Sequence, residues 1–170
     1  QNQRPLSSAN SINIARLLPQ SVYHTWAWMK SNRKKNSVIS VPSGNFGNIT
    51  GGLIAQQMGL PITKFIASVN NNDIFPKYLH SGKYIPQKGK PTLSNAMDVG
   101  NPSNFERIKS LFNSDLKKIS NKISSVSIND ENTSNTIKSI FNKYNYLADP
   151  HTAVGIKGFE KNCTKNETGI

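Results

Sequence analysis

The sequence has a single cysteine, Cys163, few acidic residues and no long apolar run. One cysteine excludes an internal disulfide framework and any zinc site built from several cysteines. No apolar stretch approaches the roughly 20 residues of a membrane-spanning helix, and the chain does not open on a charged and then apolar signal segment. We therefore expect a cytoplasmic protein without a membrane partner.

The shortage of acidic residues makes the chain strongly basic, with 21 lysines and arginines against 9 aspartates and glutamates and a formal net charge of +12. Such a surface attracts polyanions or small anionic substrates. However, arginine, which most often reads base edges, is scarce, and the one dense cluster, Arg33–Lys35, fits a solvated loop. We expect no nucleic-acid partner and keep a basic nucleic-acid-binding module as the alternative from another functional class.

Apolar residues near the start of the chain recur at three- and four-residue spacing, which predicts a helix beginning near Ile12. Pro19 lies inside this run and is expected to kink the helix. Trp26 is expected in the core, whereas Trp28, two residues further on, is expected at an interface. The apolar face consists of Ile14, Leu17, Leu18, Val22, Trp26 and Met29.

The next segment predicts a strand–helix–strand unit. The β-branched run Val38–Val41 is typical of a buried strand, and Pro42 ends it. A helix is expected over 49–58, stopped by Gly59, and a second strand over 62–69. Two strands joined in this way lie parallel, with a right-handed crossover.

The rest of the chain alternates helices with loops. Helices are expected at 74–80, from Pro102 to Phe112, from Leu116 to Ile123, from Asp130 to Phe141 and from Pro150 to Phe159, with a loop-rich stretch over 83–101 and a strand over 125–128. The order of these elements predicts an α/β fold, a parallel sheet flanked by helices.

The main candidate for a ligand site is the turn between the first expected strand and its helix. It consists of Ser43, Gly44, Asn45, Phe46, Gly47 and Asn48. The first N–H groups of a helix have no intrahelical acceptor, and the helix dipole adds partial positive charge there. Glycine lets the backbone approach an anion closely, and Ser43, Asn45 and Asn48 could add side-chain donors. These features suit a phosphate, but a plain turn without any ligand stays open.

Four segments of the chain resemble threonine synthase, in the family's order and across most of the sequence. They are Ser8–Gln20, Val41–Leu53, Thr92–Arg107 and Asp149–Val154. Four matches in order are far more specific than one glycine-bearing turn.

The resemblance implies a pyridoxal 5'-phosphate enzyme of fold type II, with tryptophan-synthase-beta-like architecture. Such an enzyme converts O-phospho-L-homoserine and water to L-threonine and phosphate, and the turn from Ser43 to Asn48 corresponds to its cup for the cofactor phosphate. In the family the cofactor forms a Schiff base with a lysine and acts as an electron sink. A threonine-synthase-like phospho-lyase, which makes a keto acid instead of threonine, is the close alternative.

Some features of the family are absent. Its Schiff-base lysine lies in a Phe-Lys-Asp motif, and the threonine that partners the pyridine nitrogen follows a Gly-Thr-Ala-His-Pro-like run; neither occurs here. We therefore expect residues 1–170 to be a large-domain segment of the catalytic region that carries the phosphate-binding loop, lacks the lysine-bearing part and the C-terminal end, and is inactive alone. Gly52 stands where alanine is commoner, which weakens the helix slightly.

Several polar residues in the matching segments have two interpretations each. Asn10 and Asn13 either cap the first helix or face the cofactor. Ser94, Asn95 and Asp98 either line the site or only order their loop.

The three histidines have no metal-ligand spacing, so no metal is expected. His24 is expected to pack against its neighbours, and His80 to lie near a helix end. His151 either caps the last helix or contacts the substrate.

Overall fold

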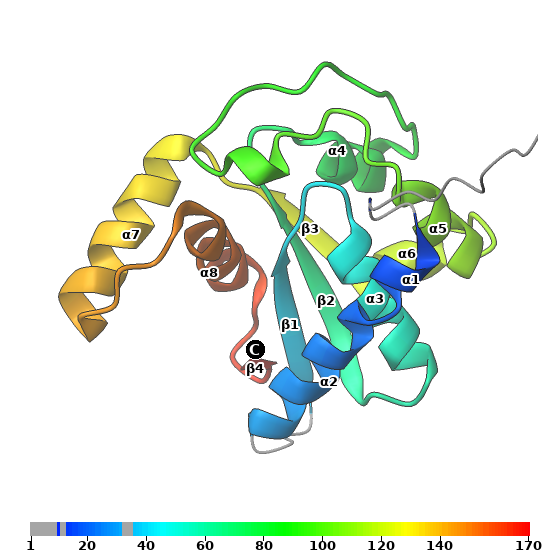
Figure 1. Ribbon diagram of the computed structural model, residues 1–170, viewed down its shortest axis with the longest axis horizontal. Coiled ribbons are helices and arrows are strands. Elements are labelled where there is room, and N and C mark those ends of the chain that lie inside the picture. The colour runs from blue at the N-terminus through cyan, green and yellow to red at the C-terminus, as the bar shows by residue number, and fades with distance from the viewer. Residues whose placement is uncertain (1–9, 11–12, 32–35) are drawn as a thin grey trace, which may run out of the picture.

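The computed structural model describes residue 10, residues 13–31 and residues 36–170; the cluster Arg33–Lys35 and the expected helix start near Ile12 lie outside them. Within the described ranges, four strands form one sheet in the order β3-β2-β1-β4, and neighbouring strands are parallel. Helices cover both faces (Figure 1), which confirms the expected α/β fold. The strands are β1 (Ser37–Pro42), β2 (Ile62–Val69), β3 (Ile123–Ser127) and β4 (Thr168–Gly169).

Helix α3 (Gly47–Gln57) connects β1 to β2 and completes the expected strand–helix–strand unit. It begins at Gly47 rather than Ile49, because Phe46 adopts a left-handed backbone and turns the chain directly into the helix. Since β1 and β2 are parallel, their carboxyl ends lie at the same edge of the sheet. The glycine-bearing turn lies at this edge.

The first expected helix is in fact two helices, α1 (Ile14–Leu17) and α2 (Gln20–Lys30). Pro19 does not kink a continuous helix but occupies the N-cap position of α2, where no intrahelical bond needs its missing N–H. Asn13 caps α1, because its side-chain oxygen accepts the N–H of Ala15 at 3.0 Å. The capping interpretation is therefore confirmed for Asn13.

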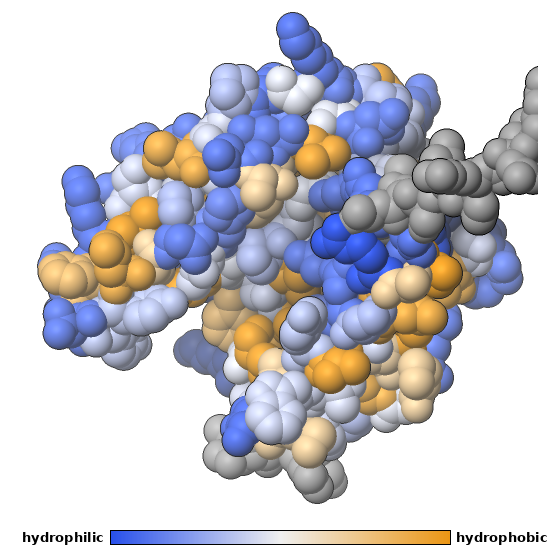
Figure 2. Space-filling model, in the orientation of Figure 1, coloured by the Kyte–Doolittle hydropathy of each residue, from blue (hydrophilic) through white to orange (hydrophobic). Residues whose placement is uncertain are grey.

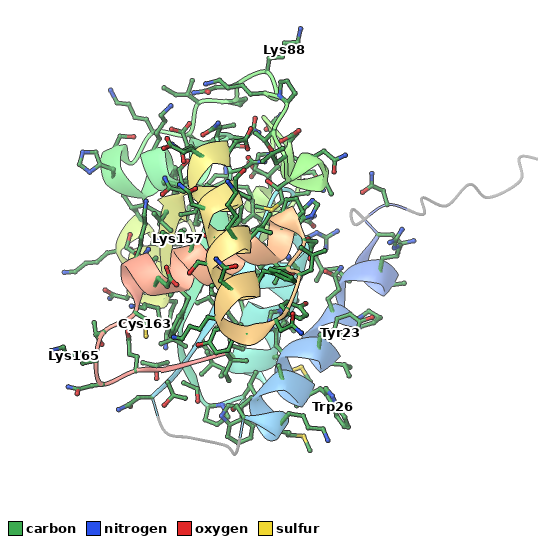
Figure 3. The ribbon with its side chains drawn as sticks, turned by 90° about the vertical axis from the view of Figure 1, so that its left-hand side faces the viewer. Tyr23, Trp26, Lys88, Lys157, Cys163 and Lys165 are labelled. Carbon is green, nitrogen blue, oxygen red and sulfur yellow. The ribbon has the colours of Figure 1, made fainter. Side chains whose placement is uncertain are left out.

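The prediction that Trp26 lies in the core is wrong, because 58% of this residue is exposed. Trp28, two residues further on, packs against the main core instead. Figure 3 shows Tyr23 and Trp26 projecting outward from α2, and Figure 2 shows apolar surface over α1 and α2. Other exposed residues of the expected apolar face are Ile14, Leu18, Val22 and Met29.

The close approach of α3 explains which side of α2 is buried. A Cβ on Gly51 would lie 3.0 Å from the Cβ of Gln20, and a Cβ on Gly52 would lie 2.6 Å from Cε1 of Phe65 and 3.1 Å from Cδ2 of His24. The two glycines therefore let α2 lie against α3 with its polar side inward. Glycine at position 52 is therefore required for this packing, although it lowers the helix propensity of α3.

Further helices and a 3-10 turn follow β2. They are α4 (Ile74–Ser81), the turn η1 (Asn95–Met97), α5 (Phe105–Leu111), α6 (Leu116–Lys122), α7 (Asp130–Tyr144) and α8 (Pro150–Asn162). The helix expected from Pro102 begins only at Phe105. The helix expected to include Ile123 ends before it, because this buried residue is the first of β3.

Helix α8 lies on the opposite side of the sheet from α3 (Figure 1). It packs closely there because the Ser40 hydroxyl donates to the carbonyl of Gly155 at 2.6 Å and Gly158 leaves room for the side chain of Ser68. A Cβ on Gly155 would lie 3.2 Å from Cδ of Pro42, so α8 passes beside the end of β1. None of the described helices is long and apolar enough to cross a membrane.

Candidate functional site

The glycine loop, residues 43–48, lies where β1 ends and α3 begins. Phe46 occupies the N-cap position with a φ of 60°, a conformation that is uncommon for residues other than glycine. Its side chain is buried against Phe75, with ring centroids 4.7 Å apart. This packing holds the strained backbone in place, so the core beneath the loop fixes its shape.

The start of α3 presents backbone donors that the protein does not use. The N–H groups of Phe46, Gly47 and Asn48 donate to no acceptor among the described residues, and the N-cap residue Phe46 makes no side-chain cap. The side-chain oxygen of Asn48 accepts the next N–H, that of Ile49, at 2.8 Å. The helix ladder begins only with the N–H of Thr50, which donates to the carbonyl of Phe46 at 3.0 Å. Together with the helix dipole, these N–H groups could hold an anion.

The loop opens onto a pocket of about 520 Å³. Residues Gly44–Asn48 line it, whereas Ser43 is buried. Other lining residues come from segments far apart in the chain: Arg16 and Gln20, Ala96 and Met97, and His151. The fold thus brings the predicted loop together with three segments whose contribution the sequence alone did not settle.

Charge in the pocket favours a small anion. The cationic side chain of Arg16 lines it, while none of the acidic residues or lysines in the described ranges does. A phosphate at the start of α3 would therefore meet positive charge from both the helix and Arg16. No cluster of His, Cys, Asp and Glu in the described part of the chain could hold a metal ion.

Two polar side chains of the loop act differently from the prediction. The hydroxyl of Ser43 donates to the carbonyl of Val41 at 3.2 Å and to the side-chain oxygen of Asn48 at 3.1 Å. The side-chain nitrogen of Asn48 donates to the carbonyl of Pro42 at 2.8 Å. These bonds brace the loop internally, which leaves the backbone N–H groups as its main donors to a ligand.

Asn45 ties the loop to the segment before α5. Its side-chain oxygen accepts the backbone N–H of Ser103 at 2.7 Å and the Ser103 hydroxyl at 3.0 Å. The sequence suggested that the side chain of Asn45 donates to a ligand, but in the bonds to Ser103 its side-chain oxygen acts as an acceptor.

A buried polar network holds the loop that carries η1. Asp98 accepts hydrogen bonds from the side-chain nitrogen of Asn70 at 2.8 Å and from the hydroxyl and N–H of Thr92 at 2.7 and 2.9 Å. Buried Ser94 lies within 3.1 Å of the same Asn70 nitrogen. Asp98 and Ser94 therefore order the loop, while Ala96 and Met97 between them line the pocket.

Asn70 and Asn72 were not singled out from the sequence, although they follow β2 directly. The side-chain nitrogen of Asn72 donates to the carbonyl of Lys90 at 2.9 Å, and its oxygen accepts the N–H of Lys90 at 2.7 Å. Their position at the carboxyl end of a parallel strand was the available signal, since sites in such sheets form at that edge.

His151 lies at the pocket wall, next to the cap of α8. Asp149 caps this helix by accepting the N–H groups of His151 and Thr152 at 2.9 and 3.3 Å. Hydrogen bonds from the Thr152 hydroxyl and from these N–H groups lower the pKa of Asp149 to about 2. The cap of α8 is therefore Asp149 and not His151, which lines the pocket instead.

His24 supports the glycine loop from behind. Its Nε2 donates to the carbonyl of Asn48 at 2.8 Å, and its ring meets Phe65 edge-on. Burial lowers the pKa of His24, so the neutral form is favoured. The prediction that this histidine packs against its neighbours is confirmed.

Sequence comparison relates the chain to known enzymes, although no protein-family model matches it. It is 45% identical over 170 residues to a threonine synthase from Buchnera aphidicola subsp. Schizaphis graminum, an alignment that covers 97% of this chain and 38% of the relative. The chain therefore spans about two fifths of the length of this relative.

Structural comparison gives the same result. The crystal structure of pyridoxal-phosphate-bound threonine synthase from Brucella melitensis matches with a TM-score of 0.89 and 33% identity, over 96% of this chain and 41% of that one. Maize serine racemase matches with a TM-score of 0.65 at 15% identity, over 98% of this chain and 49% of that one, which shows a shared fold only. None of these matches supports the nucleic-acid-binding alternative.

Proposed function

The chain is homologous to part of threonine synthase, and from this relationship we propose that the protein containing it converts O-phospho-L-homoserine and water to L-threonine and phosphate. The reaction is a carbon–oxygen lyase reaction that uses pyridoxal 5'-phosphate. The observation that carries the proposal is the 45% identity over 97% of the chain. Because the chain spans 38% of this relative, we propose that other parts of the same protein complete the active site.

We propose that the glycine loop holds the phosphate of the cofactor. The N–H groups of Phe46, Gly47 and Asn48 need an acceptor, and phosphate oxygens are strong acceptors of such bonds. Gly44 supports this fit, because a side chain there would collide with the backbone of Met97. Ser43 contributes by bracing the loop, so the full set of proposed cofactor-binding residues is Ser43, Gly44, Asn45, Phe46, Gly47 and Asn48.

When bound, pyridoxal phosphate would supply an electron sink for removing protons and the phosphate group of the substrate. The residues of this chain hold and orient the groups around it. The start of α3 would hold the phosphate, and Arg16, which lines the same pocket, adds positive charge. Met97, whose backbone lies against Gly44, and His151 form part of the pocket wall.

We further propose that residues 1–170 are inactive by themselves. The reaction needs a lysine to bind the cofactor covalently, and none of the lysines in the described ranges lines the pocket. A mixture of the isolated chain, cofactor and O-phospho-L-homoserine should therefore release no phosphate, even if the chain binds the cofactor.

The proposal is tested on the full-length protein that contains this segment. We would incubate it with pyridoxal phosphate and O-phospho-L-homoserine and measure inorganic phosphate and threonine in the same samples, with L-homoserine as the matched control. Equal amounts of phosphate and threonine from the phosphorylated substrate alone are expected. Phosphate with a keto acid instead of threonine would identify the phospho-lyase, and the absence of both products would contradict the proposal.

A further inference from the structure

We propose that His151 is a positioning residue for the phosphate pocket, in which a neutral imidazole oriented by Asp149 holds the turn η1 against the glycine loop. The inference rests on the proposed function, because it assigns a role to the wall of the same pocket. It adds a residue that the sequence left between a helix cap and a substrate contact.

The hydrogen bonds of the imidazole fix its tautomer. Nδ1 lies 3.0 Å from a carboxylate oxygen of Asp149, which can only accept, so Nδ1 carries the proton and donates. Nε2 then has a lone pair and accepts the backbone N–H of Ala96 at 3.2 Å. The low pKa of Asp149 keeps this carboxylate ionised and able to orient the ring.

The bond to Ala96 holds the middle of η1, which the hydrogen bonds of Asn70 do not reach. The polar network of Asn70 fixes Ser94 and Asp98, which flank η1. Between them, the N–H of Ala96 donates to His151 and so ties the middle of the turn to α8. The backbone of Met97, the next residue, packs directly against Gly44 of the glycine loop. A shift of Ala96 would therefore move the surface that faces the bound phosphate.

The arrangement depends on the charge of the imidazole. A protonated ring carries a proton on Nε2 and cannot accept the N–H of Ala96, so the contact requires the neutral ring. The charged groups near the ring are Asp149 on its own helix, which contacts it, and Arg16, which lines the same pocket. Asp98, on the loop that carries Ala96, is bound by Asn70 and Thr92.

The first test measures the wall without any ligand, by hydrogen–deuterium exchange of the full-length protein. His151→Leu removes the acceptor, and His151→Gln supplies a side-chain oxygen near the position of Nε2 as the matched control. In the leucine variant, amides of residues 95–98 should exchange roughly fivefold faster, while those of β2 stay unchanged and show that the protein is folded. In the glutamine variant they should exchange at nearly the wild-type rate. Equal exchange in the leucine variant and the wild type would overturn the proposal.

The second test measures pyridoxal phosphate affinity by fluorescence titration at about pH 8. The leucine variant should bind roughly fivefold more weakly, and the glutamine variant should bind like the wild type. Equal affinity of the leucine variant and the wild type would overturn the proposed role of His151. If the wild type binds no cofactor, the proposed function fails, and the exchange experiment still decides the role of His151.

Discussion

The backbone of Met97 occupies the space where a side chain on Gly44 would have to lie, because a Cβ there would be 2.6 Å from the Cα of Met97. Real Cβ atoms essentially never approach other atoms so closely. The glycine loop and the turn η1 therefore touch backbone to backbone, and together they line the pocket that we propose for the phosphate.

This contact predicts that Gly44→Ala weakens cofactor binding more than it weakens the fold. The new methyl group would force the glycine loop and η1 apart. We therefore expect pyridoxal phosphate affinity to fall at least tenfold in the full-length protein. Fluorescence titration measures the affinity, and thermal unfolding measures stability. Gly59→Ala is the control, because its φ of 109° strains alanine while no atom lies within 4 Å of the new Cβ, so this variant is destabilised without displacing a neighbour. Gly59→Ala should cost about 1 kcal/mol of stability and leave cofactor affinity unchanged; equal loss of affinity in both variants would argue against a specific role of Gly44.

Gly47→Asp is expected to weaken cofactor binding by electrostatic repulsion. The substitution places a carboxylate in the first turn of α3, beside the N–H groups that would meet the phosphate. An acidic side chain at a helix start is compatible with the helix itself, but Gly47 is buried, so the effect of the charge is judged against a neutral side chain at the same position. Gly47→Asn has nearly the same shape without the charge and should retain more affinity than the aspartate variant. Unchanged cofactor affinity in Gly47→Asp would contradict the assignment of the loop.

Gly52→Ala separates helix propensity from packing. Propensity alone predicts a gain of about 1 kcal/mol in stability. The structure predicts a loss of about 1–3 kcal/mol from overpacking, because the new methyl group would lie 2.6 Å from Cε1 of the fully buried Phe65. Chemical denaturation gives the sign, and the double variant with Phe65→Leu should recover part of the loss. A stabilised Gly52→Ala protein would show that α2 and α3 are less tightly packed than described.

Asp149 should make the fold sensitive to acid. Its pKa is lowered from 3.8 to about 2 in the folded protein, so the stability it provides is present above about pH 4 and is lost as the pH falls towards 2. Asp149→Asn keeps a residue that can cap α8 and should flatten this part of the stability profile. Asp149→Ala also removes the cap and should cost about 1 kcal/mol at neutral pH. An asparagine variant with the same acid dependence as the wild type would assign the effect to other carboxylates.

The sequence was sufficient for the order of elements and for the loop, because both depend on local signals. The β-branched run before Pro42 and the two glycines after it predicted a strand, a turn and a helix, and the structure places them there. Tertiary packing decided what local signals could not. The apolar spacing of α2 placed Trp26 in the core, but the glycines of α3 draw the other side of α2 inward.

The wall of the pocket was beyond the reach of the sequence for the same reason. Asn70, Ala96 and His151 are separated by 26 and 55 residues along the chain, and only the parallel sheet brings their segments to one edge. The polar character of Ser94, Asp98 and His151 allowed either a structural or a ligand-binding role. Hydrogen-bond partners, which depend on the fold, distinguished the two.

The most direct test of the account is a crystal structure of the full-length protein with pyridoxal phosphate. We predict that the phosphate lies at the start of α3, with its oxygens about 2.7–3.2 Å from the backbone nitrogens of Phe46, Gly47 and Asn48. A phosphate seated elsewhere in the protein, with the glycine loop open to water, would contradict the central claim that this loop is the cofactor's anchor.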